Sequence, residues 1–125
     1  MGIDIRASWP GQTEGEAAAQ ITGFSVEHGH VGYLREAYHG EPYATHYLVP
    51  EAFEANAGEG VQIPAAILRE RLPRTIRLAI ARQRQVYGEN SGIDDPVVRA
   101  FADFVELCER KEAETGEPCT ISASW

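Results

Sequence analysis

Long apolar runs are absent from this chain. No stretch approaches the roughly 18 consecutive apolar residues that a membrane-spanning helix needs. The first ten residues, MGIDIRASWP, lack the basic and apolar regions of a secretory signal peptide. Arg6 stands where an N-myristoylation motif requires Ser or Thr, although Gly2 is in place. The sequence therefore predicts a soluble chain without an anchor, which by default is cytoplasmic.

Cysteine is scarce, with Cys108 and Cys119 the two present in 125 residues. Two thiols do not make the disulfide framework of a small secreted domain, so the fold must rest on a hydrophobic core. A chain of this length buries roughly two-thirds of the surface that it exposes when unfolded, which is enough for one core. No break in composition marks a linker, and residues 1–125 are predicted to form a single domain.

Positive charge is also in short supply. Lys and Arg number 11 against 19 Asp and Glu, which gives a net charge of −8. A field of that sign repels phosphate backbones and anionic lipid. We therefore expect neither nucleic acid nor a membrane surface as a partner.

Local motifs that would name a chemistry are missing. The chain has no Gly-x-Ser-x-Gly elbow, no P-loop, no dinucleotide fingerprint and no His-Glu-x-x-His pair. Cys108 lies on the apolar stripe of a predicted helix, so it is expected to be a buried, inert thiol. No single short motif assigns an activity.

What the chain does have is a clear pattern at both ends. Ile3, Ile5 and Ala7 alternate with polar residues near the start, and Ile121 and Ala123 do so near the end. Period-two alternation predicts a half-buried strand. Two strands of equal pattern, each with one apolar face, are expected to be neighbours in one sheet.

Two long helices are predicted between these strands. The first runs from Pro64 to Gly88 with an apolar stripe at helical spacing, and Pro73 predicts a kink or a break within it. The second begins with Asp95 as N-cap and ends at Gly116. The expected fold class is α+β, a two-layer single domain in which a small sheet, with the N- and C-terminal strands adjacent, is covered by the two long helices.

Shorter elements are predicted from more local signals. Thr13 and Glu16 have capping-box spacing ahead of a short helix. The remaining expectations are a strand over 20–27, a short helix over 31–39, extended backbone over 43–49, a helical turn from Pro50, and a loop over 56–60.

Residues 28–47, HGHVGYLREAYHGEPYATHY, hold all four histidines and four of the five tyrosines. We call this stretch the His/Tyr segment. His28 and His30 form a His-x-His pair, which on a strand projects to one face. Glu36 and His39 are three residues apart, a spacing that on a helix brings a carboxylate and an imidazole to one ion. The four residues predict a divalent-metal site, and the simpler alternative is imidazoles that face solvent or hydrogen-bond within loops.

The same segment predicts ligand binding without a metal. Its tyrosines combine an apolar body with a polar tip, its glycines allow close approach to the backbone, and its arginine can clamp an anion. The candidates are Tyr33, Arg35, Tyr38, Tyr43 and Tyr47. Such a set suits a small polar ring compound, a sugar or a protein partner. The alternative is that a tyrosine such as Tyr33 or Tyr38 simply packs inward.

Three functions follow from these patterns. The preferred hypothesis is a small binding or regulatory protein of unknown ligand, with the His/Tyr segment as its recognition surface. The second is a metal-dependent or histidine-assisted hydrolase at the same place, because a histidine beside a carboxylate is what general acid–base chemistry requires. His28 with Glu27, or His39 with Glu36, would be such a pair.

The third hypothesis is an oligomerisation module built on the arginine-rich stretch 69–84. Six of the 11 basic residues lie there, namely Arg69, Arg71, Arg74, Arg77, Arg82 and Arg84. A basic stripe on an acidic protein can dock onto a second copy as a homodimer. The simpler alternative is a solvated face paired locally with Glu70, Glu106 or Glu109.

Overall fold

The computed structural model describes residues 2–20, 29–55, 59–88, 92 and 95–125. The strand predicted over 20–27 falls outside this set except for Gln20, and so does His28. Among the described residues, no helix is long and apolar enough to cross a bilayer.

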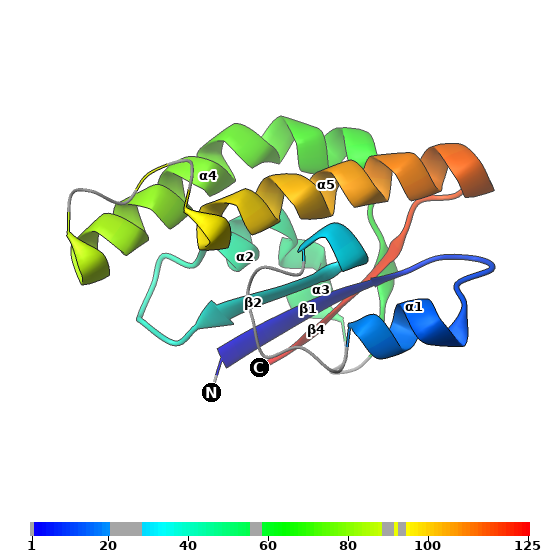
Figure 1. The fold of residues 1–125 in the computed structure, drawn as a ribbon, viewed down its shortest axis with the longest axis horizontal. Helices are drawn as coiled ribbons and strands as arrows, with labels where there is room; N and C mark the ends of the chain where they lie inside the picture. The colour runs from blue at the N-terminus through cyan, green and yellow to red at the C-terminus, as the bar shows by residue number, and fades with distance from the viewer. Residues whose placement is uncertain (1, 21–28, 56–58, 89–91, 93–94) are drawn as a thin grey trace.

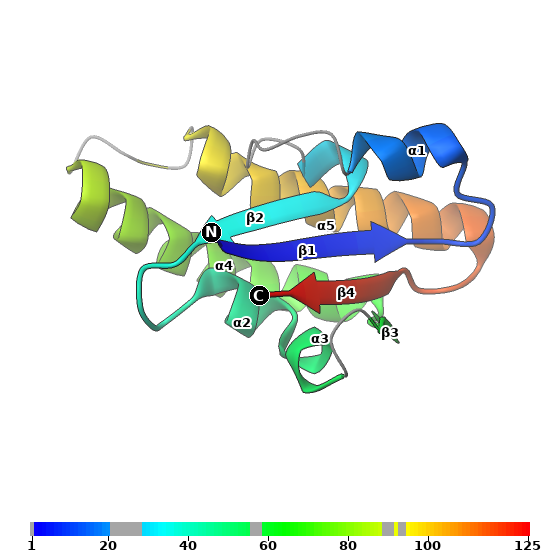
Figure 2. The same ribbon diagram turned by 90° about the horizontal axis from the view of Figure 1, so that it is seen from below.

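Within the described residues, four strands form one antiparallel sheet in the order β2-β1-β4-β3. They are β1 (Gly2–Ser8), β2 (Tyr33–Ala37), β3 (Val61–Gln62) and β4 (Thr120–Ser124). The first and last strands are neighbours, with Ile5 opposite Ala123. This confirms the prediction that the strands at the two ends of the chain lie side by side (Figure 2).

The long helices make the second layer. Figure 1 shows α4 (Ala65–Tyr87) and α5 (Pro96–Thr115) side by side over one face of the sheet. The shorter helices are α1 (Glu14–Ala19), the 3-10 turn η1 (Gly29–Val31), α2 (Ala44–Leu48) and α3 (Pro50–Glu54). Figure 2 shows α2 and α3 along the β4 side of the sheet. The chain therefore has the predicted two-layer α+β fold.

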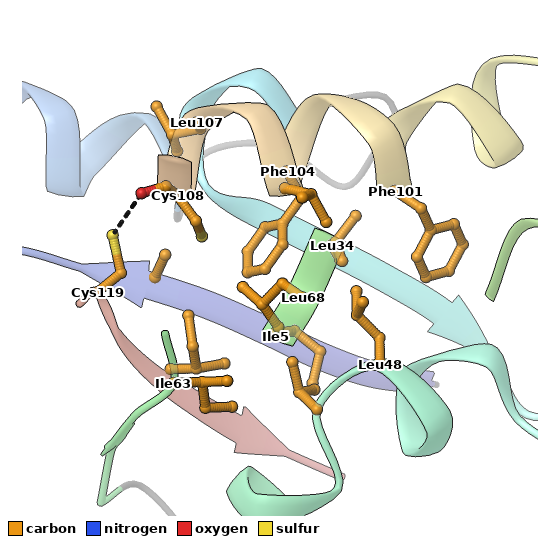
Figure 3. Close-up of a cluster of buried hydrophobic side chains, with 14 of the residues drawn as sticks. Ile5, Leu34, Leu48, Ile63, Leu68, Phe101, Phe104, Leu107, Cys108 and Cys119 are labelled. Atoms are coloured by element: carbon orange, nitrogen blue, oxygen red, sulfur yellow. Dashed lines mark hydrogen bonds between the residues drawn. The ribbon is translucent and has the colours of Figure 1, made fainter. Parts of the chain in front are cut away.

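The hydrophobic core fills the space between these layers (Figure 3). Burying one large apolar side chain contributes roughly 1.5–3 kcal/mol, so a shared core of this kind dominates the stability of the fold. The side chains with essentially no exposed surface include Ile5, Leu34, Leu48, Leu68 and Phe104. In the same close-up the Cys119 thiol approaches the Cys108 carbonyl oxygen at 4.0 Å, and both cysteines are buried and free.

Both long helices begin and end close to the residues that their sequences predict. Asp95 caps α5 by accepting a hydrogen bond from Val97 N at 2.9 Å, and Gly116 adopts the left-handed conformation (φ 79°) that ends it. Pro73 lies within α4 without splitting it into two helices. Val86 of the predicted apolar stripe is 51% exposed, because the last turn of α4 borders a cavity instead of the core.

The local predictions divide into successes and two errors. The capping box of Thr13 and Glu16 starts α1, and Pro50 starts α3, as expected. The helix predicted over 31–39 is wrong, since residues 33–37 form β2, and the extended backbone predicted over 43–49 is wrong, since residues 44–48 form α2. Both elements are formed by contacts outside their own stretch of sequence, since β2 pairs with β1 and a carboxylate of β2 caps the start of α2.

Candidate functional site

That carboxylate belongs to Glu36, which lies opposite Ile3 on the core face of β2. Its Oε1 accepts hydrogen bonds from Thr45 N (2.9 Å) and Thr45 Oγ1 (2.6 Å). Its Oε2 accepts from Ala44 N (3.0 Å) and lies 2.9 Å from His39 Nε2. The residue that precedes α2, Tyr43, gives no side-chain cap, so Glu36 supplies the cap from another element.

His39 completes this network at the start of the loop between β2 and α2. Its Nδ1 lies 2.7 Å from the Gly40 carbonyl oxygen, while Nε2 meets Glu36. Both ring nitrogens of His39 are therefore engaged by oxygen atoms of the protein. Tyr43 stacks on the ring at 4.4 Å, and its hydroxyl accepts from His39 N and Gly40 N. These bonds hold residues 39–43 against the end of the sheet.

A cavity of about 580 Å³ opens beside this network. It lies between the end of β2, the last turns of α4 and the first turns of α5, and its volume is typical of sites for small organic molecules. Its apolar lining residues are Ala37, Ala79, Val86, Val97 and Phe101. Its polar lining residues are Arg35, Glu36, Tyr38, His39, Arg82, Gln83 and Asp95. Part of the His/Tyr segment therefore forms one wall, and the two long helices form the other.

The predicted ligand-binding residues divide between this cavity and other places. Arg35 and Tyr38 line the cavity. Tyr33 alternates with Leu34 and so lies on the opposite face of the sheet, where its hydroxyl donates to Asp4 Oδ1. Burial and this hydrogen bond raise the pKa of Tyr33, which keeps the phenol neutral. Tyr33 is therefore buried on the face of the sheet opposite the core, in contact with Asp4, and does not pack inward beside Leu34 as the simpler alternative expects.

Tyr43 and Tyr47 do not line the cavity either. Tyr43 lies behind His39 and begins a row of ring contacts through His46 and Phe53 to the last residue, Trp125. Tyr47 lies on α2 with the Arg74 guanidinium 5.2 Å from its ring centroid. The tyrosines of the segment thus do not share one concavity.

The predicted metal ligands are not brought together in the described part of the chain. Glu36 and His39 meet, but His30 borders a different hollow of about 410 Å³, next to Trp9 and Lys111, and His28 is outside the described residues. No group of three or more His, Cys, Asp or Glu side chains among the described residues is arranged to hold a metal ion. The geometry therefore gives the predicted divalent metal no support.

The Glu36–His39 pair is also poorly placed for acid–base chemistry. Glu36 accepts four hydrogen bonds and His39 uses both ring nitrogens within the protein. A general base needs a free nitrogen or oxygen within reach of a substrate proton. The pair positions the loop, and it gives the hydrolase hypothesis no free base.

Seven of the twelve residues that line the cavity lie outside the His/Tyr segment, which the sequence singled out as a site. Arg82 was expected only as part of an exposed basic face, and Asp95 only as a helix cap. Val97 and Phe101 carry the helical apolar pattern of a core residue. No local signal separates them from the core, because the cavity exists only once α4 and α5 lie beside β2.

The other arginines of α4 mostly contact groups of this chain. Arg69 forms an ion pair with Glu109 of α5, as the simpler alternative expects. Arg71 makes a two-pronged contact with Glu51 of α3, with both distances 2.8 Å. The arginine-rich stretch therefore ties α4 to its neighbours.

Comparisons with models of protein families, with curated proteins and with solved structures gave no match to this chain.

Proposed function

We propose that the chain is a small binding protein of the cytoplasm that holds a largely apolar small molecule in the cavity between β2, α4 and α5. The single observation that carries this proposal is the cavity itself, about 580 Å³ in volume, with five apolar and seven polar residues around it. Two buried free thiols are consistent with a reducing compartment.

Binding is favoured over catalysis by the state of the polar groups. The Glu36 network is saturated by internal hydrogen bonds, so it acts as a rigid support for the wall of the cavity. Tyr38, which follows β2, is the member of the His/Tyr segment best placed to touch a ligand, whereas the Arg35 guanidinium contacts Asp4 on the other face of the sheet.

The test is a titration with a neutral apolar probe, 2-naphthalenemethanol, followed in amide proton–nitrogen correlation spectra. We expect the shifted signals to cluster at cavity residues such as Ala37, Tyr38 and Gln83. The variant Val97→Trp fills the cavity and should abolish these shifts. Val31→Trp makes the same change in the second hollow and should leave them unchanged.

Two results would contradict the proposal. One is a probe that shifts no signal of the cavity residues at any soluble concentration. The other is a Val97→Trp protein that remains folded and binds the probe as tightly as the unaltered chain.

A further inference from the structure

We propose that the molecule held in this cavity is an organic anion, a carboxylate on an apolar ring-bearing body, and that its charge pairs with Arg82. This inference rests on the proposed binding function and names the chemical class of the ligand. The observations that support it are the charged side chains around the cavity and the hydrogen bonds and ion pairs that each of them makes within the chain.

The two acidic groups of the cavity wall already accept hydrogen bonds through each of their oxygens. Glu36 accepts four hydrogen bonds from its own chain. Asp95 accepts from Val97 N at 2.9 Å through one oxygen and from Gln83 Nε2 at 3.3 Å through the other. A cationic ligand would therefore find no unpartnered carboxylate in the described wall.

Arg82 of α4 is in the opposite situation. Within the described residues, Arg82 makes no ion pair, and it donates from Nη1 to the neutral Gln85 at 3.1 Å. Its Nε is buried and has no hydrogen-bond partner there. Arg35 differs, because it lies on the face of β2 that carries Tyr33 and its guanidinium contacts Asp4 there at 3.3 Å. A guanidinium has five N–H donors, so the unused hydrogen-bonding capacity of the cavity is on the donor side.

The apolar side of the cavity defines the rest of the ligand. Val86, Val97 and Phe101 come from the two helices and Tyr38 from the loop after β2. Tyr38 and Val86 are 48% and 51% exposed, so apolar surface that a ligand would cover is open to water. A flat ring suits the aromatic residues Tyr38 and Phe101, since aromatic rings prefer offset or edge contacts with one another.

The negative net charge of the chain does not oppose this assignment. Charges farther away than a Debye length of about 8 Å at physiological salt are largely screened, whereas a guanidinium beside the ligand is not. The carboxylates of Glu36 and Asp95 line the same cavity, but each of their oxygens has a hydrogen-bond partner within the chain, so the unpartnered donor of Arg82 favours an anion.

The experiment compares three probes that share one ring and differ in the charged group, namely 2-naphthoate, 2-naphthalenemethanol and 2-naphthylmethylammonium. We expect naphthoate to bind about tenfold or more tightly than the alcohol, because a hydrogen bond to a charged group contributes on that order. The ammonium compound should bind most weakly. Affinities are measured by the same amide titration at one fixed salt concentration.

Arg82→Gln should remove the preference by bringing the affinity for naphthoate down to that for the alcohol. Retained binding of the alcohol shows that the cavity of the variant is intact. Arg77→Gln removes an exposed arginine of the same helix that does not line the cavity and should change nothing, and Arg82→Lys should keep a preference for the anion.

The outcomes separate this inference from the proposed function. If the acid and the alcohol bind the unaltered chain equally well at the cavity, the anion assignment is overturned and the binding function stands. If no probe binds, both fall. If Arg82→Gln no longer binds the alcohol, its cavity is disrupted and the variant is not informative. The anion assignment is then tested by comparing the three probes on the unaltered chain and on Arg82→Lys, and equal binding of acid and alcohol there overturns it.

Discussion

At the scale of single residues, Glu36 links β2 to the start of α2. Its carboxylate is buried on the core face of β2, accepts from the backbone of Ala44 and Thr45 and meets the ring of His39. A buried carboxylate is stable only when its oxygens are hydrogen-bonded. The same contacts begin α2, which has no side-chain cap next to it in the sequence.

We therefore predict that Glu36→Gln destabilises the fold by about 3 kcal/mol, because an amide group replaces one acceptor with a donor that faces donors. Urea denaturation at neutral pH measures the change. Glu41→Gln, at an exposed position of the same loop, is the control and should alter stability by less than about 0.5 kcal/mol. Equal stability of the two variants would show that the network contributes little.

At the scale of elements, α3 is joined to α4 by the contact between Glu51 and Arg71. Arg71 Nη1 also donates to the carbonyl oxygen of Leu48, so one side chain holds both ends of the turn between α2 and α3. The hydrogen bonds from Arg71 hold the pKa of Glu51 below its ordinary value of 4.5. The contribution of this carboxylate is therefore present above pH 4.5 and is lost as the pH falls through the lower folded value.

Glu51→Gln should accordingly cost about 1 kcal/mol or less at neutral pH, since the pair is partly exposed, and the cost should shrink toward zero in acid. Denaturation of both proteins at neutral pH and well below pH 4.5 gives the two differences. Glu54→Gln, at an exposed position of the same helix, should show no such trend. A cost for Glu51→Gln that is the same at both pH values would contradict this account.

Pro73 gives a second prediction at this scale. Proline lacks the N–H that the carbonyl oxygen four residues earlier would accept, and its ring crowds that group. Pro73 lies in the middle of α4 and its side chain is exposed to solvent. Alanine restores the missing hydrogen bond but also makes the unfolded chain more flexible, which opposes part of the gain. Pro73→Ala should therefore stabilise the protein by about 1–2 kcal/mol. The midpoint of thermal unfolding reports this. Pro64→Ala, at the position preceding the helix, should give a smaller gain, and the reverse order would refute the prediction.

The elements that the sequence predicts correctly are those whose signals are local. The strands at the two ends alternate over their own lengths, and α5 carries its cap, Asp95, and its terminating glycine, Gly116, in its own sequence. The elements predicted wrongly, β2 and α2, depend on a bond between them. Glu36 interrupts the apolar pattern of β2, and the cap of α2 lies eight residues back from Ala44. A pattern read along the chain carries no information about such a contact.

At the scale of the whole molecule, the same reasoning explains the candidate site. Arg35 and Tyr38 were predicted because aromatic and charged residues cluster in one stretch of sequence. Arg82 and Phe101 were not, because they join that wall only through the packing of α4 and α5 over the sheet (Figure 1). The His/Tyr segment supplies one side of the cavity, and α4 and α5 supply the other.

The net charge of the molecule and the contacts that the arginines of α4 make within it bear on whether these arginines bind a second copy. Arg69 pairs with Glu109, Arg71 pairs with Glu51, and Arg74 lies over the ring of Tyr47, so these cations are directed toward groups of their own chain. Two copies, each with a net charge of −8, repel one another, and at low salt this repulsion is least screened.

We therefore expect light scattering to give a mass near 13.7 kDa at both low and high salt. A dimer at low salt that separates at high salt would instead show that the basic face binds a second copy through charge. A dimer that persists at high salt would indicate an apolar contact, and Trp125, which is 57% exposed, is the first residue to replace with serine. Arg77→Gln distinguishes the two kinds of dimer, because it removes an exposed cation of α4 and leaves the apolar surface unchanged.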